Sequence, residues 1–173
     1  MADASDKLLN TLANVDAFSH LEADELKPLI ESTTRQRLMV GGSLWTRGET
    51  GESAFVLLSG RIEISRRVQP DGQRNRQIDR VGELLSLPYL IESWEHESSA
   101  YPLERSEVLE LPGEAFWEMF ERGEPAAYAI VDAIAAEQVD KMREVNERLQ
   151  RVFGQPAETL RTLKRRAGGE RRR

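Results

Sequence analysis

Short turn signals recur along the middle of the chain, and their spacing is the feature that most constrains the fold. Turns containing glycine or proline follow one another at roughly 8–12-residue intervals between residues 35 and 111. The segment Arg61–Ser65 alternates strictly, so that Ile62 and Ile64 share one face and charged side chains share the other. Strands this short and this regularly interrupted predict a small antiparallel barrel or sandwich.

The predicted strands either alternate in polarity or form a continuous apolar run between two turns. Gly41-Gly42 and Pro70-Asp71-Gly72 are the clearest turns, and the second joins two strands as a hairpin. After Val81 the pattern breaks into a strand end, a turn and a short helix that ends near Ser93. The predicted strands are Arg35–Val40, Ser43–Thr46, Ala54–Leu58, Arg61–Ser65, Arg76–Val81, Ser98–Leu103 and Glu107–Leu111.

Helices are predicted on both sides of this region. One short helix is expected near Asp6–Asn14, and a second runs to about Glu31. Ser19-His20-Leu21-Glu22 has the form of a capping box, which predicts that its serine caps the second helix. A third helix follows residue 112, and Pro125 opens a long one that ends near residue 153. The predicted fold class is therefore mainly β with flanking helices.

The long helix carries an apolar seam with alternating spacings of three and four residues, which is typical of a coiled coil. The seam consists of Tyr128, Val131, Ala135, Gln138, Met142, Val145, Leu149 and Val152. Two interpretations stay open: the helix packs lengthwise on its own barrel, or it pairs with a second copy of the chain. A helix of roughly 28 residues spans roughly 40 Å, which is longer than a barrel of this size and favours a homodimer.

Composition narrows the class of protein. The chain has 173 residues, of which 39% are apolar and 31% are charged, as expected of one soluble globular domain. No stretch approaches the roughly 20 apolar residues of a membrane span, and the first residues do not form an export signal. The lack of cysteine excludes disulfides and fits a reducing cytoplasm, where we expect the protein to be located.

No arrangement of residues predicts catalysis or metal binding. The two histidines, His20 and His96, lie far apart in the sequence, which argues against a zinc site built on histidine. The sequence contains no Gly-Lys-Ser/Thr phosphate loop, no His-Glu-x-x-His and no Gly-x-Ser-x-Gly. We therefore expect that the protein is not an enzyme and has neither catalytic residues nor a metal site.

Four segments occur in an order that resembles a known family. They are residues 14–21, 48–62, 82–84 and 106–111, and the most specific pair is Leu58-Ser59-Gly60-Arg61 with Gly82-Glu83. Together they resemble the cyclic nucleotide-binding domain, the sensor fold of the catabolite activator protein family, over about residues 12–153. The resemblance implies a jelly-roll-like β-barrel that holds cAMP or cGMP in a phosphate-binding cassette. It also implies that the long C-terminal helix covers the pocket and forms a dimer.

The cassette matches the family pattern in its first half only. The family's Gly-Glu pair falls on Gly82 and Glu83, whereas His96 and Glu97 replace the arginine and serine that complete the phosphate cradle. Carboxylates near a phosphate oppose its binding, so we expect weak or absent binding of cAMP or cGMP and assign no cofactor. The candidate ligand-binding residues are Gly82, Glu83, Leu84, His96, Glu97, Ser98 and Gln138.

Two of these residues have a second interpretation. Glu83 either contacts a ribose, as the resemblance implies, or caps the turn and the short helix that follow it. Gln138, which lies near Glu137 and Lys141, either reads a base edge or is the polar residue that fixes the register of a coiled coil.

The C-terminal residues are basic in an otherwise acidic chain. Residues 155–173 hold seven Lys or Arg and two Glu, while residues 1–154 carry a net charge of −11. About 20 residues are too few for the helix-turn-helix domain of transcription regulators in the family, so DNA binding by that route is not expected. Lys164–Arg173 either contacts an acidic surface or is a solvated, flexible tail.

The leading hypothesis is a non-catalytic regulatory module, dimeric through the long helix, that acts by contacts with an unidentified protein partner. A DNA-associated regulator acting through the basic tail ranks last. The alternative is a genuine nucleotide sensor with a non-standard phosphate contact, made by hairpin arginines that otherwise form an exposed, charged hairpin: Arg66, Arg67, Arg74, Arg76 and Arg80. The expected layout is N-terminal helices (1–33), a barrel (34–112) with a cassette-like segment (82–99), C-terminal helices (113–153) and a basic tail (154–173).

Overall fold

The computed structural model describes residues 2–68 and 72–153 of the chain. The described residues form two compact units that divide after residue 133. The predicted turn residues Pro70 and Asp71 and the basic tail lie outside the described residues. All of the described strands belong to the first unit, and the larger part of the last helix belongs to the second.

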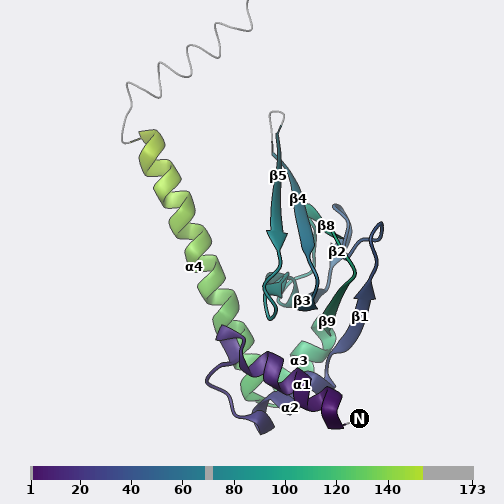
Figure 1. The fold of residues 1–173 in the computed structure, drawn as a ribbon. Helices are drawn as coiled ribbons and strands as arrows, with labels where there is room; N and C mark the ends of the chain where they lie inside the picture. The colour runs from purple at the N-terminus through teal and green to yellow at the C-terminus, as the bar shows by residue number, and fades with distance from the viewer. Residues whose placement is uncertain (1, 69–71, 154–173) are drawn as a thin grey trace, which may run out of the picture. The chain divides into compact units, whose positions relative to one another are not determined.

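Antiparallel pairing organises the described strands into three sheets (Figure 1). The first sheet has the order β1 (Thr34–Leu38), β9 (Ser106–Pro112), β3 (Ser53–Ser59) and β6 (Leu84–Leu85). The second has the order β5 (Gly72–Ile78), β4 (Ile62–Val68) and β8 (Ser98–Pro102), and the third pairs β2 (Thr50–Gly51) with β7 (Trp94–Glu95). The mainly β, jelly-roll-like fold is thereby confirmed, although the described strands form three sheets and not one closed barrel.

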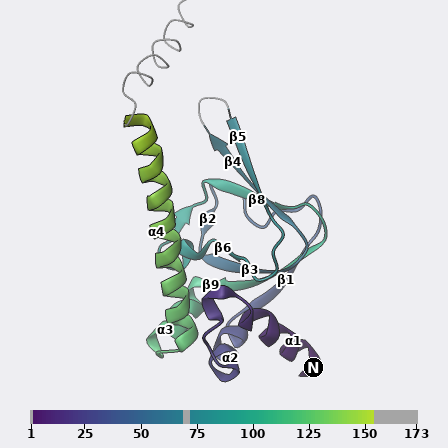
Figure 2. The same ribbon diagram turned by 60° about the vertical axis from the view of Figure 1, so that its left-hand side comes forward.

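The helices flank these sheets. The N-terminal elements are α1 (Ala2–Ala13), the 3₁₀ turn η1 (Asp16–Phe18) and α2 (Ala23–Glu31), and the C-terminal ones are α3 (Gly113–Glu121) and α4 (Pro125–Phe153). A second 3₁₀ turn, η2 (Leu87–Leu90), lies between β6 and β7. Within the first unit, α1, α2 and α3 lie together beyond one end of the strands, and the β4–β5 hairpin extends away at the opposite end (Figures 1 and 2).

Strand β3 is buried on both faces, which explains its continuous apolar sequence. On one face, Leu57 packs inside the roll with Trp45, Phe55, Ile62, Ile78, Leu85, Ala100 and Val108. The other face is covered by the N-terminal helices and the start of α4, whose side chains line an apolar gap with Val56: Leu12, Phe18, Leu29 and Ile130. The interior is therefore apolar on both sides of the strand to which the cassette segment is hydrogen-bonded.

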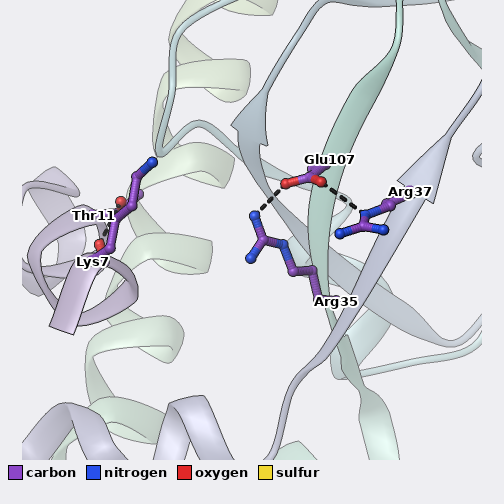
Figure 3. Close-up of polar contacts among 5 residues, drawn as sticks. All are labelled: Lys7, Thr11, Arg35, Arg37 and Glu107. Carbon is purple, nitrogen blue, oxygen red and sulfur yellow. Dashed lines mark hydrogen bonds and ion pairs between the residues drawn. The ribbon is translucent and has the colours of Figure 1, made fainter. Parts of the chain in front are cut away.

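A carboxylate on β9 joins the edge strand β1 to its neighbour (Figure 3). Arg37 lies opposite Glu107 in the ladder, and its Nε donates to the carboxylate at 3.0 Å. Arg35 donates to the other oxygen of Glu107, and this hydrogen bond is the main reason that the pKa of Glu107 lies below its ordinary value.

In the same view, the Thr11 hydroxyl donates to the backbone carbonyl of Lys7 at 3.0 Å within α1.

The predicted capping box at the second helix is wrong by three residues. Helix α2 has Glu22 as its N-cap, and the backbone N–H of Glu22 donates to the carboxylate of Glu25 at 2.8 Å. The Ser19 hydroxyl instead donates to the carbonyl of Asp16 at 2.9 Å. A glutamate at the cap position accepts backbone hydrogen bonds much as a hydroxyl does, so the same spacing recurs one turn later.

The predicted strand Ser43–Thr46 is also wrong. Trp45 makes a single bridge, to Ala100, and the residues around it do not form a ladder. Conversely, β2 lies in a segment that we interpreted as a turn, and β7 lies in a segment to which we assigned no element. Each has only two residues, which is too short for alternation to be recognised.

Two glycines at tight turns adopt backbone angles that other residues avoid. Gly48 has φ +87° and Gly60 has φ +88°. A Cβ at Gly60 would overlap the Oγ of Ser106 and lie 2.6 Å from its Cα, whereas nothing lies within 4 Å of a Cβ at Gly48. Gly48 is therefore required for its dihedral angle alone, and Gly60 is required for its dihedral angle and for space.

We predict that Gly60→Ala destabilises the protein more than Gly48→Ala does. The left-handed backbone should cost Gly48→Ala about 1–2 kcal/mol of unfolding free energy. Gly60→Ala should lose more, because the backbone of Ser106 must also move. Urea unfolding of both variants measures the difference, and equal losses would show that the contact with Ser106 is not a constraint.

Candidate functional site

The cassette segment begins at a glycine turn that is hydrogen-bonded to the buried strand β3. Gly82 has φ +85°, and its N–H donates to the carbonyl of Leu57 at 2.7 Å. The N–H of Leu57 donates in turn to the carbonyl of Glu83 at 3.0 Å. These reciprocal bonds hold the backbone of Glu83 on a rigid element of the core.

The helical turn of the cassette begins late and offers few backbone donors. Leu84–Leu85 extends as β6, and Ser86 has a left-handed backbone with φ 60° before η2 begins. Within η2, Pro88 has no N–H, and the N–H of Tyr89 donates to the carbonyl of Ser86 at 3.1 Å. Helix N-termini bind phosphate through free backbone N–H groups. Of the first three residues of this turn, one lacks an N–H group and another already donates its N–H within the protein.

His96, which stands at the position of the expected arginine, lies in an aromatic stack. The side chain is only 5% exposed. Its ring centroid is 4.9 Å from that of Trp45, with 14° between the planes, and 4.3 Å from that of Tyr89. Trp45 belongs to the apolar cluster inside the roll, so the imidazole extends that cluster as a packing residue.

Gly51 provides the room that this stack needs. A Cβ at this position would overlap Cδ1 of Tyr89 and lie 2.8 Å from Nε2 of His96. The backbone of His96 is also fixed, because its N–H donates to the carbonyl of Glu49 at 2.8 Å and its carbonyl accepts from the N–H of Gly48 at 2.9 Å. Ring and backbone together hold His96 in the interior.

Two arginines of the β4–β5 hairpin donate hydrogen bonds to the carboxylates at the two ends of the cassette. Nη2 of Arg76 donates to Oε1 of Glu83 at 2.6 Å, and the Glu83 side chain is only 17% exposed. Arg66 donates to the more exposed carboxylate of Glu97. Glu83 does not cap η2, whose N-cap is Ser86. The hairpin thus brings both ends of the cassette together.

The remaining predicted residues lie on other elements. Leu84 is half-buried in β6, and Ser98 is half-buried in β8, opposite Arg66 of β4. Gln138 is exposed in the second unit, and both interpretations of its role stay open. A third hairpin arginine, Arg80, forms an ion pair with Asp16 at 3.4 Å.

The predicted seam of α4 exposes large apolar side chains. Met142, Val145 and Leu149 are 65%, 55% and 46% exposed. Val131 is half-buried and Ala135 is exposed, while the side chain of Val152 lies outside the described residues. An exposed apolar row on a helix of 29 residues is an unpartnered surface in the single chain.

Comparison with protein families decides the assignment. The sequence model described as the cyclic nucleotide-binding domain matches residues 35–123, which include the cassette and α3. The chain belongs to the cyclic nucleotide-binding domain family. The resemblance based on Gly82-Glu83 and the turn after β3 is thereby confirmed.

Solved structures show the same fold at low sequence identity. The catabolite activator protein of Thermus thermophilus is 21% identical with a TM-score of 0.68, over 78% of this chain and 62% of that one. A cyclic nucleotide-binding domain from Methylobacillus flagellatus is 13% identical with a TM-score of 0.70, covering 84% and 82%. The regulatory subunit of a cAMP-independent protein kinase A from Trypanosoma brucei is 14% identical with a TM-score of 0.65, covering 79% and 47%. No curated protein matches the chain.

Trp45, Gly51 and Tyr89 were not predicted to be part of the cassette region. The available signals were an aromatic residue before the Gly48 turn and another after Pro88, and each indicates only a core position. The pairing of hairpin arginines with cassette carboxylates was not predicted either, because it depends on the register of β4 with β5 and β8.

Membrane-spanning helices and metal clusters are both absent from the described part of the chain. No helix within residues 2–68 and 72–153 combines the length and the apolar character needed to cross a membrane. In the same ranges, acidic and histidine side chains do not gather in a group of three that could hold a metal ion.

Burial of His96 links the cassette to the stability of the fold. Burial lowers the pKa of His96 below its ordinary value of 6.5, and the nearby carboxylate of Glu49 only partly offsets this effect. The unfolded chain therefore binds a proton more readily than the folded one. The free energy of unfolding must then fall as the pH drops below about 6.5, and it is unaffected by His96 well above that value.

We predict that His96→Gln reduces this loss of stability in acid. The measurement is the unfolding free energy between pH 7.5 and 5, compared with that of the wild type. His20→Gln, which changes the exposed histidine, is the matched control. If both variants had the same pH dependence, the burial of His96 would not contribute to it.

Proposed function

We propose that this chain is a non-catalytic regulatory module of the cyclic nucleotide-binding domain family whose cassette does not bind cAMP or cGMP in the family manner. It acts as a homodimer through α4 and signals by contact with a protein partner. The cysteine-free sequence is compatible with a cytoplasmic location. The observation that carries the proposal is the packing of His96 between Trp45 and Tyr89.

The residues present do not fit a cyclic phosphate. A phosphate needs a permanent positive charge and paired donors, which an arginine supplies and a buried neutral imidazole does not. Glu97 adds a negative charge one residue later, and the carboxylate of Glu83 is already bonded to Arg76. The family fold also occurs in a kinase regulatory subunit described as cAMP-independent, in keeping with regulation without this ligand.

The exposed seam of α4 supports the dimer. Met142, Val145 and Leu149 recur at spacings of three and four residues, and each leaves about half or more of its surface to solvent. A second helix with the same seam would cover these side chains by knobs-into-holes packing. Gln138 would then be the polar position that sets the register.

We predict that the wild-type chain gives no saturable heat with cAMP in calorimetry. The double variant His96→Arg/Glu97→Ser should gain measurable affinity, because it restores the forked donor and removes the carboxylate. His96→Lys/Glu97→Ser is the matched control, since it restores the charge without the fork. Micromolar binding by the wild type would contradict the proposal, and no gain in the arginine variant would place the defect in the packing of Trp45 and Tyr89.

We predict that Val145→Glu converts the dimer to a monomer. The substitution places an unpaired charge in the seam, and burying that charge costs more free energy than the apolar packing around it supplies. Gln150→Glu is the matched control, because it adds the same charge to an exposed position outside the seam. Light scattering gives the mass of each variant, and a Val145→Glu protein that stays dimeric would place the interface elsewhere.

A further inference from the structure

One face of the β4–β5 hairpin presents three arginines side by side. Arg66 pairs directly with Arg74 in the ladder, and Ile64 pairs with Arg76. Directly opposed residues share a face, as do residues two apart on a strand. Ile62 and Ile78, further along the same face, are buried in the roll. The arginines therefore continue the core-facing side of the hairpin beyond the apolar interior.

The direct opposition of two of these arginines is electrostatically unfavourable unless counter-charges lie beside them. Like charges directly opposite each other destabilise an antiparallel pair, and Arg66 and Arg74 occupy such a position. The surrounding segment concentrates positive charge, because residues 61–80 hold six arginines and three acidic residues in a body that is otherwise strongly acidic. A cluster of guanidiniums on one face is typical of a site that binds a multiply charged anion.

The cassette supplies only two counter-charges to this face. The carboxylate of Glu83 accepts a hydrogen bond from Arg76, and that of Glu97 accepts one from Arg66. Arg74 has no ion pair among the described residues. All three arginine side chains are exposed, so an anion in solution can reach them. Ser98, which lies opposite Arg66 on β8, adds a hydroxyl on the same face.

We propose that Arg66, Arg74 and Arg76 form a binding site for a linear oligophosphate, whose phosphates replace the carboxylates of Glu83 and Glu97. Cross-strand neighbours lie about 5 Å apart and residues two apart on a strand about 7 Å apart. Two separate carboxylates, those of Glu83 and Glu97, now accept from these arginines, so an anion that replaces both needs at least two charged groups. A chain of two or more linked phosphates carries a charge on each group and spans these distances. A cyclic phosphodiester carries a single charge and does not.

The exchange would change how the hairpin is held. In the absence of the anion, the hairpin is bonded to both ends of the cassette through Glu83 and Glu97. Transfer of the guanidiniums to a phosphate chain releases both carboxylates, so binding on the hairpin alters the cassette. The proposed site includes neither His96 nor the α4 seam, so it does not require that the dimer forms.

The test is calorimetric titration of the full chain with inorganic tripolyphosphate. We expect one saturable site per chain whose affinity falls as salt is raised. Arg66→Gln, Arg74→Gln and Arg76→Gln should each weaken binding by about fivefold or more, because each removes a charge-assisted hydrogen bond. Arg105→Gln, an exposed arginine between β8 and β9, should change binding by less than about twofold and is the matched control.

The carboxylates provide the sharper test. Glu83→Gln and Glu97→Gln should each tighten binding, because the arginine they release no longer has an internal partner. Glu92→Gln removes the same charge from an exposed cassette residue that has no arginine partner among the described residues, and it should tighten binding less. Equal effects of Glu97→Gln and Glu92→Gln would overturn the exchange.

Further titrations identify the source of the phosphate chain. Equal affinity for tripolyphosphate and a nucleoside triphosphate would assign recognition to the phosphates alone, and tighter binding of the nucleotide would add a contact to its base. Absence of saturable binding, or an equal loss in Arg66→Gln and Arg105→Gln, would overturn the site. Binding of cAMP in a parallel titration would contradict the proposed function without affecting this site.

Discussion

The aromatic stack around His96 is the contact on which the cassette region depends. Its imidazole stacks on an indole that belongs to the apolar interior and contacts a phenol from the cassette turn at an interplanar angle of 40°. Gly51 contributes by having no side chain, since a single methyl group would overlap both Tyr89 and His96. The residue at which the resemblance implies an arginine is in this chain part of the packing, and the cassette is connected to the core through it.

The architecture could be predicted from sequence because its signals are local. The apolar run of β3, the alternation of β4 and the turn residues between them specify strands without reference to distant parts of the chain. The errors arose where two local solutions compete. Glu22 and Glu25 satisfy the capping spacing as well as Ser19 does, and Trp45 has strand-like neighbours but only one bridging partner.

The site was harder to predict because its contacts are non-local. His96 and Glu97 were identified as departures from the family pattern, but the sequence does not indicate what fills the space of the missing arginine. The space is filled by the ring of His96 stacked on Trp45, which lies about fifty residues earlier in the chain. The pairs between hairpin arginines and cassette carboxylates likewise follow from the register of β4 with β5 and β8, which sequence periodicity does not define.

The edge strand β1 has a consequence for how copies of this protein can meet. Among the described residues it has one neighbour, β9, and its sequence places Arg35 and Arg37 at alternate positions. Adding a foreign strand there would strip water from two guanidiniums that are held by Glu107. Charged side chains at these positions are therefore expected to disfavour extension of the sheet by a second chain along β1.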